Sequence, residues 1–404
     1  MKILHTADWH LGKRLDQASR LPEQAEVLQE ICQIADQEEV DVVVVAGDLF
    51  DTFNPSSEAM ELLYSSLHQL ANHGKRLVLA IAGNHDSPER IDAPDALARV
   101  SGIVFVGRPG ETIRPLELPT GLKITHTAPG FLEAWLPSHP FPLRVAHTPY
   151  ANEARIRQAI HLNDSSEDAL RDYLQQHWQE IADTYLDSKG FNLLVTHLFF
   201  QKEGEPTEDE PADEKPILHV GGAQAIYSRN IPTAYHYVAL GHLHRPHSVD
   251  THPCDIRYAG SPLSYSFAEA NQQKSVELLT VAPGGVLERR SIPLKKGKPL
   301  LRHRFQTLEE GIAWLQDHTN AWVELTWVTD TFLESSDKEQ LYAAHEGIIQ
   351  VIPEIKRTEN VAQAIPTLDL SQDMATLFDQ YFTSKHQTPP NESIRQLFKE
   401  ILSQ

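Results

Sequence analysis

Short apolar runs alternate with amphipathic stretches over the first hundred residues of the chain. The runs Lys2–Ala7, Asp41–Ala46 and Arg76–Ala82 are typical of buried strands. Between them, Glu23–Glu38 and Ser56–Asn72 carry apolar residues at the spacing of one helix face. This alternation predicts a layered α/β core, in which ligands bind where loops leave the carboxyl ends of the strands.

The pattern changes after residue 100. From Ile103 to Val145 the apolar runs are short and rich in proline, which is consistent with a second sheet packed on the first. Ala151–Thr184 is expected to be mostly helical. Gln201–Pro216 contains seven carboxylates and three prolines, and we expect an exposed loop there. We assign residues 1–285 to one domain.

Residues 300–360 are expected to form a small βαβαβ domain. Its predicted strands are Leu301–Gln306, Ala321–Trp327 and Glu354–Thr358, and its predicted helices are Leu308–His318 and Lys338–Ile349.

Residues 371–404 are expected to form two helices whose apolar stripes have the same spacing. The stripes are Met374, Leu377, Phe378, Tyr381 and Phe382, then Ile394, Leu397, Phe398, Ile401 and Leu402. Such stripes usually pack on each other or on the parent domain. A terminal helix pair can equally dock in a groove of a partner protein.

A strip of seven basic residues begins after the first domain and extends into the second. It runs from Arg289 to Arg304 without an intervening carboxylate. Two interpretations remain open: a solvated linker, or a strip that contacts the phosphates of a nucleic acid.

Composition narrows the class of protein. The chain has 404 residues, 41% of them hydrophobic, and no apolar run near the ~20 residues of a membrane span. Its start does not resemble a signal peptide, so we expect a cytoplasmic protein.

Cys32 and Cys254 are the only cysteines, which excludes a disulfide framework and a thiolate zinc site. The net charge of −21 argues against a surface that binds nucleic acid throughout, so a DNA-binding function would call for a partner.

Five short motifs rich in Asp, Asn and His occur in order along the chain. Each is weak alone, but three of them follow predicted strands, and all offer the oxygen and imidazole ligands that suit manganese, iron or zinc. The motifs are Asp8-Trp9-His10, Gly47-Asp48-Leu49-Phe50-Asp51, Gly83-Asn84-His85-Asp86, Thr196-His197 and Gly241-His242-Leu243-His244.

This ordered set resembles the calcineurin-like metallophosphoesterases, whose signature runs D-x-H, GDxxD, GNH[DE], H, GHxH. The resemblance implies a four-layer αββα domain with two divalent metal ions. One metal would be held by Asp8, His10, Asp48 and His244, and Asp48 would bridge to a second held by Asn84, His197 and His242. Two such ions ~3.5–4 Å apart can clamp a phosphodiester and activate a water.

The resemblance also assigns the residues beside the ligands. His85 would be catalytic, stabilising the transition state or protonating the leaving alkoxide. Asp51 and Asp86 would orient ligands, although local capping is an alternative for both.

Details of the motifs favour nucleases within this family. The serine/threonine phosphatases carry GDxxDRG and GNHE, whereas Thr52 follows Asp51 here and Asp86 follows His85. Residues 8–12 (DWHLG), 241–246 (GHLHRP), 258–262 (YAGSP) and Phe267 are similar to the SbcD nucleases, the bacterial branch of the double-strand-break repair nucleases.

That branch implies a manganese-dependent exonuclease on duplex ends and endonuclease on single strands and hairpins, acting in DNA repair. It also implies a homodimer that forms a heterotetramer with SbcC, an SMC-like ATPase. The small domain would help to hold DNA, and the terminal helices would bind SbcC.

Two rival hypotheses remain. The alternative enzyme is a phosphodiesterase for small cyclic or dinucleotide substrates, which seldom needs the additional domain and helices. The alternative non-enzyme is a scaffold that has lost catalysis. The complete ligand set and His85 argue against the scaffold.

Overall fold

The computed structural model describes residues 1–151, 167–202, 204, 225–329, 335–355 and 374–386, together with Arg395 and Phe398. The chain divides into two compact units, Met1–Glu354 and Ile355–Gln404. Within the described ranges, no helix is long and apolar enough to cross a membrane.

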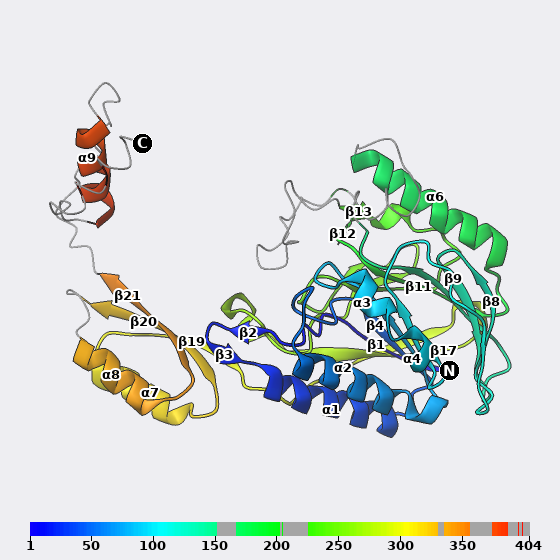
Figure 1. The fold of residues 1–404 in the computed structure, drawn as a ribbon, viewed down its shortest axis with the longest axis horizontal. Helices are drawn as coiled ribbons and strands as arrows, with labels where there is room; N and C mark the ends of the chain where they lie inside the picture. The colour runs from blue at the N-terminus through cyan, green and yellow to red at the C-terminus, as the bar shows by residue number, and fades with distance from the viewer. Residues whose placement is uncertain are drawn as a thin grey trace. The chain divides into compact units, whose positions relative to one another are not determined.

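Two sheets form the centre of the first unit (Figure 1). The six-stranded sheet has the order β18 (Leu287–Pro293), β17 (Ser275–Val281), β1 (Lys2–Thr6), β4 (Val42–Ala46), β5 (Leu77–Ile81), β6 (Ile103–Val106). The eight-stranded sheet has the order β15 (His247–Asp250), β16 (Asp255–Tyr258), β14 (Tyr237–Gly241), β11 (Phe191–His197), β10 (Leu143–Thr148), β9 (Phe131–Trp135), β8 (Lys123–Ala128), β7 (Leu116–Glu117).

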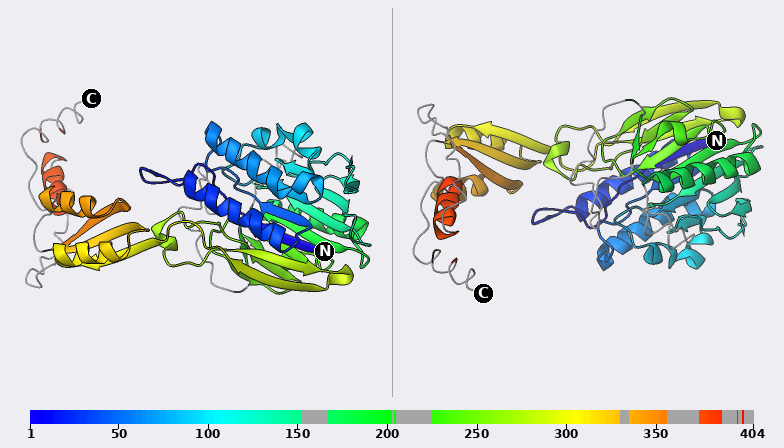
Figure 2. Two further views of the ribbon diagram at one scale, coloured as in Figure 1. Left: turned by 90° about the horizontal axis from the view of Figure 1, so that it is seen from below. Right: turned by 90° about the horizontal axis from the view of Figure 1, so that it is seen from above.

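Helices cover the outer face of each sheet. The first sheet carries α1 (Leu21–Gln37) and α2 (Ser57–Leu70), which run side by side in Figures 1 and 2, and the second carries α6 (Glu167–Tyr185). Two short helices, α3 (Pro88–Asp92) and α4 (Asp95–Arg99), precede β6. The expected four-layer αββα architecture is confirmed.

The four valines of β4 explain how the layers are held together. Val43 and Val45 pack in the cluster beneath α1 and α2, whereas Val42 and Val44 pack between the two sheets. A strand buried on both faces is a continuous apolar run rather than an alternating one. A third apolar cluster, which includes Trp178 of α6, covers the outer face of the second sheet.

Two predicted boundaries are wrong. Ile103 does not begin the second sheet, because β6 pairs in parallel with β5. The second helix of the small domain, α8 (Ser335–Ala344), ends before Gly347, where a Cβ atom would lie 2.1 Å from the carbonyl oxygen of Ala321. The last strand, β21 (Ile348–Ile355), therefore begins six residues earlier than expected.

The small domain otherwise has the predicted element order. Its sheet has the order β19 (Leu300–Phe305), β20 (Trp322–Thr329), β21, with α7 (Leu308–Asp317) and α8. The Thr307 hydroxyl caps α7 by accepting a hydrogen bond from the Glu310 amide at 3.3 Å. Three side chains from different parts of the unit, Leu15, Phe267 and Leu300, share a buried cluster where β19 begins.

Residues 289–293 and 300–304 of the basic strip lie in strands β18 and β19, so they are not a linker as one interpretation expected. Its four arginines all form ion pairs: Arg289 with Asp255 and Glu277, Arg290 with Glu38, Arg302 with Glu324 and Arg304 with Glu354. Contact of the strip with phosphates, the other interpretation, stays untested.

The second unit contributes α9 (Met374–His386). The ring of Phe378 stacks on that of Phe398 with centroids 4.0 Å apart, and Asp379 pairs with Arg395 at 3.0 Å. The two C-terminal segments therefore contact each other, as one of the two interpretations expected. The rest of the second predicted helix lies outside the described residues, as do 152–166 and most of the acidic loop.

Candidate metal centre

The five motifs meet at the carboxyl ends of parallel strands from both sheets. Asp8, Asp48 and Asn84 follow the neighbouring strands β1, β4 and β5 of the first sheet. His197 ends β11, and His242 follows the neighbouring strand β14 of the second sheet. Parallel strands place these ends at one edge, and face-to-face packing brings the two edges together.

Close backbone contact joins the two sheets at this edge. A Cβ atom on Gly241 would lie 1.8 Å from the carbonyl oxygen of Ala46, so any larger residue would push β14 away from β4. The Nδ1 atom of His197 donates a hydrogen bond to the same oxygen at 2.8 Å. Because Nδ1 carries the proton, Nε2 of His197 is the atom available to a cation.

Four non-glycine residues of the motifs have left-handed backbones. The φ angles are +54° at Asp8, +45° at His10, +48° at Asp48 and +110° at His242. Such conformations cost ~1–3 kcal/mol each and cluster at functional sites. Backbone bonds hold two of them, from the Asp8 amide to the Gly47 carbonyl at 3.0 Å and from the His10 amide to the Asp48 carbonyl at 2.9 Å.

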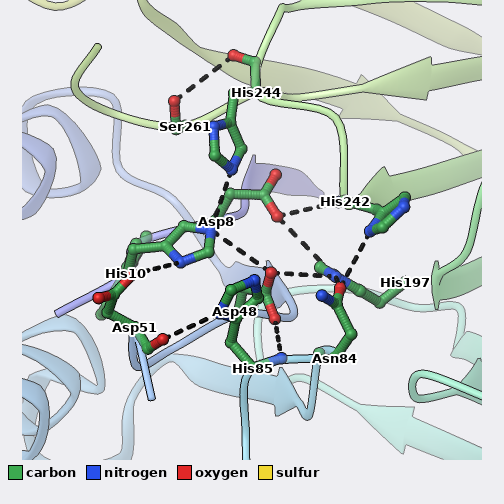
Figure 3. A network of polar contacts seen from close by, with 12 residues as sticks. Asp8, His10, Asp48, Asp51, Asn84, His85, His197, His242, His244 and Ser261 are labelled. Atoms are coloured by element: carbon green, nitrogen blue, oxygen red, sulfur yellow. Dashed lines mark hydrogen bonds and ion pairs between the residues drawn. The ribbon is translucent and has the colours of Figure 1, made fainter. Parts of the chain in front are cut away.

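Seven predicted ligands converge in one buried space (Figure 3). On one side, the Nε2 atoms of His10 and His244 lie 3.0 Å apart. On the other, Oδ1 of Asn84 lies 2.9 Å from His197 Nε2 and 3.0 Å from His242 Nδ1. Asp48 lies between the two groups, and the main chain of His242 donates to Oδ1 of Asp8 at 2.9 Å.

The arrangement suits divalent cations. The Oδ2 atom of Asp8 is buried and has no hydrogen-bond partner among the described residues. Buried carboxylate oxygens normally have partners, because an unpaired charge in the interior is costly. Asp8, His10 and Asp48 also offer ligand atoms within 4.8 Å of one another. Carboxylate, amide and imidazole groups without thiolates form a ligand set for divalent metal ions.

Burial shifts the pKa values of these groups strongly. It raises the pKa of Asp8 to about 7 and lowers that of His10 to about 4, because a charge is poorly solvated there. At His197 burial alone would lower the pKa, but the carboxylates of Asp48 and Asp8 outweigh it and raise the pKa to about 9. The negative charge of the carboxylates is thus balanced by a protonated imidazole at His197. Bound cations can supply that positive charge instead.

His85 lies beside this space, next to Asp48 (Figure 3). Its Nδ1 atom donates to the carbonyl oxygen of Asp51 at 2.9 Å, and its main-chain amide donates to Oδ1 of Asp48 at 2.9 Å. The carboxylate of Asp51 lies 3.6 Å from Nδ1 of His10 and 2.9 Å from Nζ of Lys13. Asp51 therefore contacts a predicted ligand directly instead of only capping its own loop.

Asp86 ties two motif loops together. Its carboxylate accepts hydrogen bonds from the amides of Leu49 at 3.0 Å, Phe50 at 2.9 Å and Gly83 at 2.8 Å. Two of these bonds reach the loop that follows β4, so Asp86 fixes the loop that carries Asp48. Only the bond from Gly83, three residues before Asp86, is a local cap.

Sequence reasoning missed the polar groups behind His10 and His244. Gln24 contacts the loop of His10, and Glu269 lies 3.4 Å from His244 Nδ1. Burial alone would raise the pKa of Glu269, but His244 and the ammonium of Lys274, 2.5 Å away, hold that pKa well below its usual range. No local pattern marks Gln24, because its side-chain partners lie 12 to 241 positions away. Residues Ser266–Glu269 have the pattern of a capping box, but nothing local links Glu269 to His244, 25 positions away.

Comparison with known proteins agrees with the geometry. The calcineurin-like phosphoesterase family model matches residues 1–246. The SbcD subunit of the nuclease SbcCD from Bacillus subtilis is 34% identical over 100% of this chain and 98% of its own length. The SbcD subunits of Rhodobacter capsulatus and Staphylococcus epidermidis are 33% and 30% identical, over 75% and 73% of this chain and 71% and 70% of theirs. The chain therefore belongs to the calcineurin-like phosphoesterases, a family of metal-dependent hydrolases, and within them to the SbcD nucleases.

Proposed function

We propose that this chain is a manganese-dependent DNA nuclease that hydrolyses phosphodiesters at a two-metal site. It would act as an exonuclease on duplex ends and as an endonuclease on single strands and hairpins. Relatives named as nuclease subunits support this, since one of them aligns along the entire chain. Manganese is the proposed ion because the resemblance to the SbcD nucleases favours it. The ligand set of oxygen and imidazole nitrogen by itself suits manganese, iron or zinc.

The position of Asp48 is the observation that carries the two-metal proposal. Its Oδ2 atom lies 3.4 Å from Nε2 of His10 and 3.4 Å from Nε2 of His197, one histidine from each side of the site. A carboxylate in that position can serve both halves. We assign Asp8, His10, Asp48 and His244 to one cation, with Asp48 shared, and Asn84, His197 and His242 to the other.

Two cations held by these residues would supply Lewis-acid activation of a water and neutralise charge on the phosphate. The protein's own contribution comes from His85. Because Nδ1 of His85 donates to the Asp51 carbonyl, Nε2 is left to interact with substrate. We propose that His85 stabilises the transition state or delivers a proton to the leaving alkoxide, a role worth ~10²–10⁴-fold in rate.

We further propose that the chain assembles with an SbcC-type ATPase, because the relatives are named as subunits of a complex called SbcCD. The homodimer that we also propose is what the resemblance to the SbcD nucleases implies. The net charge of −21 supports a partner that contributes to DNA binding. The apolar stripe of α9, which includes Met374 and Tyr381 as exposed side chains, is the proposed attachment segment.

Cleavage of end-labelled linear duplex DNA with Mn²⁺ tests the function. The wild type is expected to release nucleotides, and His85→Gln is expected to lose at least ~10²-fold in rate because the proton-handling imidazole is removed. Mn²⁺ binding by His85→Gln should equal that of the wild type. His68→Gln, on the exposed side of α2, is the matched control and should cleave normally.

A different result would favour a small phosphodiester as the substrate instead of DNA. If the wild type does not cut DNA even with the partner ATPase and ATP, yet hydrolyses bis-p-nitrophenyl phosphate, the chain is a phosphodiesterase for small substrates. If it binds no Mn²⁺ and hydrolyses neither, it has lost catalysis.

A further inference from the structure

One buried amide holds the backbone of the first motif. Nε2 of Gln24, in the first turn of α1, donates to the carbonyl of His10 at 2.7 Å and to that of Trp9 at 3.2 Å. Its Oε1 atom accepts from the amide of Gly12 at 3.0 Å. A single side chain thus fixes the loop on both sides of a predicted metal ligand.

Tyr265 completes this contact from a distant part of the chain. Its hydroxyl donates to the carbonyl of Trp9 and accepts from Nε2 of Gln24, which lies 3.1 Å away. Its ring packs edge-to-face against the imidazoles of both His10 and His244, with centroids 5.6 and 5.9 Å away. Tyr265 therefore contacts the two histidines that would share one cation.

The same segment also orients His244. The amide of Tyr265 donates to Oε1 of Glu269 at 2.9 Å, the oxygen that lies 3.4 Å from Nδ1 of His244. The network from Gln24 through Tyr265 to Glu269 is thus continuous behind one half of the site. A partner on the far nitrogen of a histidine fixes the ring orientation that a metal requires.

Burial decides which role these residues can have. Gln24 is 1% exposed and Tyr265 is 4% exposed, so neither can contact a DNA substrate. Their polar atoms bind main-chain atoms beside His10, whose φ of +45° is unfavourable without such support. Together with the bond from the His10 amide to the Asp48 carbonyl, these contacts restrain the loop that carries the imidazole.

We propose that Gln24 and Tyr265 are positioning residues that hold His10 against His244 and so set the affinity of the cation these histidines share. The inference rests on the ligand assignment proposed above. It predicts a selective effect: the cation assigned to Asn84, His197 and His242 should bind normally when Gln24 or Tyr265 is changed.

Titration calorimetry of the full chain with Mn²⁺ tests this. Gln24→Met keeps the length of the side chain and removes its hydrogen bonds, and Tyr265→Phe removes one hydroxyl. Each should weaken one of two Mn²⁺ sites by ~10–100-fold and leave the other within about twofold. Two matched controls should bind Mn²⁺ as the wild type does. They are Gln33→Met, on the exposed face of α1, and Tyr64→Phe, at a side chain that is 38% exposed.

Circular dichroism below the melting transition separates positioning from loss of fold. If both variants are folded and bind two Mn²⁺ with unchanged affinity, the positioning role is wrong. Equal weakening of both sites would also overturn it, since that indicates a general disturbance. A wild type that binds fewer than two Mn²⁺ would overturn the ligand assignment and this inference together. Selective weakening in a chain that does not cut DNA would support the inference while the proposed function fails.

Discussion

A Cβ atom on Gly83 would lie 2.0 Å from the Oδ1 atom of Asp48 and 2.3 Å from its main-chain nitrogen. The loop that carries Asn84 and His85 therefore packs directly on the residue between the two halves of the site. The contact is also bonded, because Oδ1 of Asp48 accepts from the His85 amide at 2.9 Å.

Gly83→Ala should disrupt the site. The added methyl must displace Asp48, which costs ~1–3 kcal/mol of folding free energy by overpacking and moves a shared ligand. We expect Mn²⁺ affinity to fall by at least ~10-fold in calorimetry. Gly110→Ala is the control, since a Cβ there meets nothing within 4 Å and adds only backbone strain at φ +71°. Unchanged Mn²⁺ binding by Gly83→Ala would contradict the close packing.

Removal of metal should lower thermal stability. The buried carboxylates and imidazoles of the site are arranged for cations, and an ion that binds only the folded state stabilises it by ~2.7 kcal/mol at 100 times its dissociation constant. The melting temperature measured in EDTA should therefore lie several degrees below that in excess Mn²⁺. Asp48→Asn should show little of this difference, and a wild type that melts identically in both buffers would argue against a metal centre.

His147 should make folding sensitive to acid. It is 1% exposed, and neither ring nitrogen has a hydrogen-bond partner in the described part of the chain. Burial, with the nearby His177, lowers its pKa to about 3, whereas an unfolded histidine has a pKa of ~6.5. Between these two pKa values the unfolded state binds a proton at this histidine and the folded state does not. The free energy of unfolding therefore decreases as pH is lowered, by up to ~1.4 kcal/mol per pH unit.

Denaturant titrations of His147→Leu at pH 7, 6 and 5 would measure this contribution. The variant should lose less stability than the wild type as pH falls, because it has no group to protonate. His68→Leu, at an exposed position, should keep the wild-type slope. A slope in His147→Leu as steep as in the wild type would mean that other groups carry the acid sensitivity.

Glu277 should be important for stability, though it lies away from the metal centre. Its side chain is fully buried, yet it pairs with Arg257 and Arg289, each at 3.0 Å, and accepts from Ser291 at 2.8 Å. Glu277→Ala leaves two arginines without this carboxylate, and loss of one partner of a buried pair costs ~3–5 kcal/mol. Glu288→Ala, exposed on β18, should change stability by less than ~0.5 kcal/mol. A loss below ~1 kcal/mol for Glu277→Ala would show that the pair contributes little.

Local patterns were sufficient for much of the fold and for the choice of site residues. The runs at Lys2–Ala7 and Asp41–Ala46 became β1 and β4, because a strand buried on both faces must be apolar throughout. The order of the five motifs identified the ligand candidates, since their residue types are those that bind hard and borderline cations. The boundary between α8 and β21 was missed, because the close approach of Gly347 to Ala321 is not visible in local spacing.

Only the tertiary structure decided how the candidates meet. Periodicity alone did not place strands before His197 or His242, and their approach to Asp48 depends on two sheets packing face to face. Gln24, Tyr265 and Glu269 could not be assigned to the site from sequence. The contacts of Gln24 with His10, of Gln24 with Tyr265 and of Glu269 with His244 span 14, 241 and 25 positions. The identity of a ligand depends on its own chemistry, which a sequence contains, whereas its orientation depends on buried hydrogen bonds that form only when distant segments pack together.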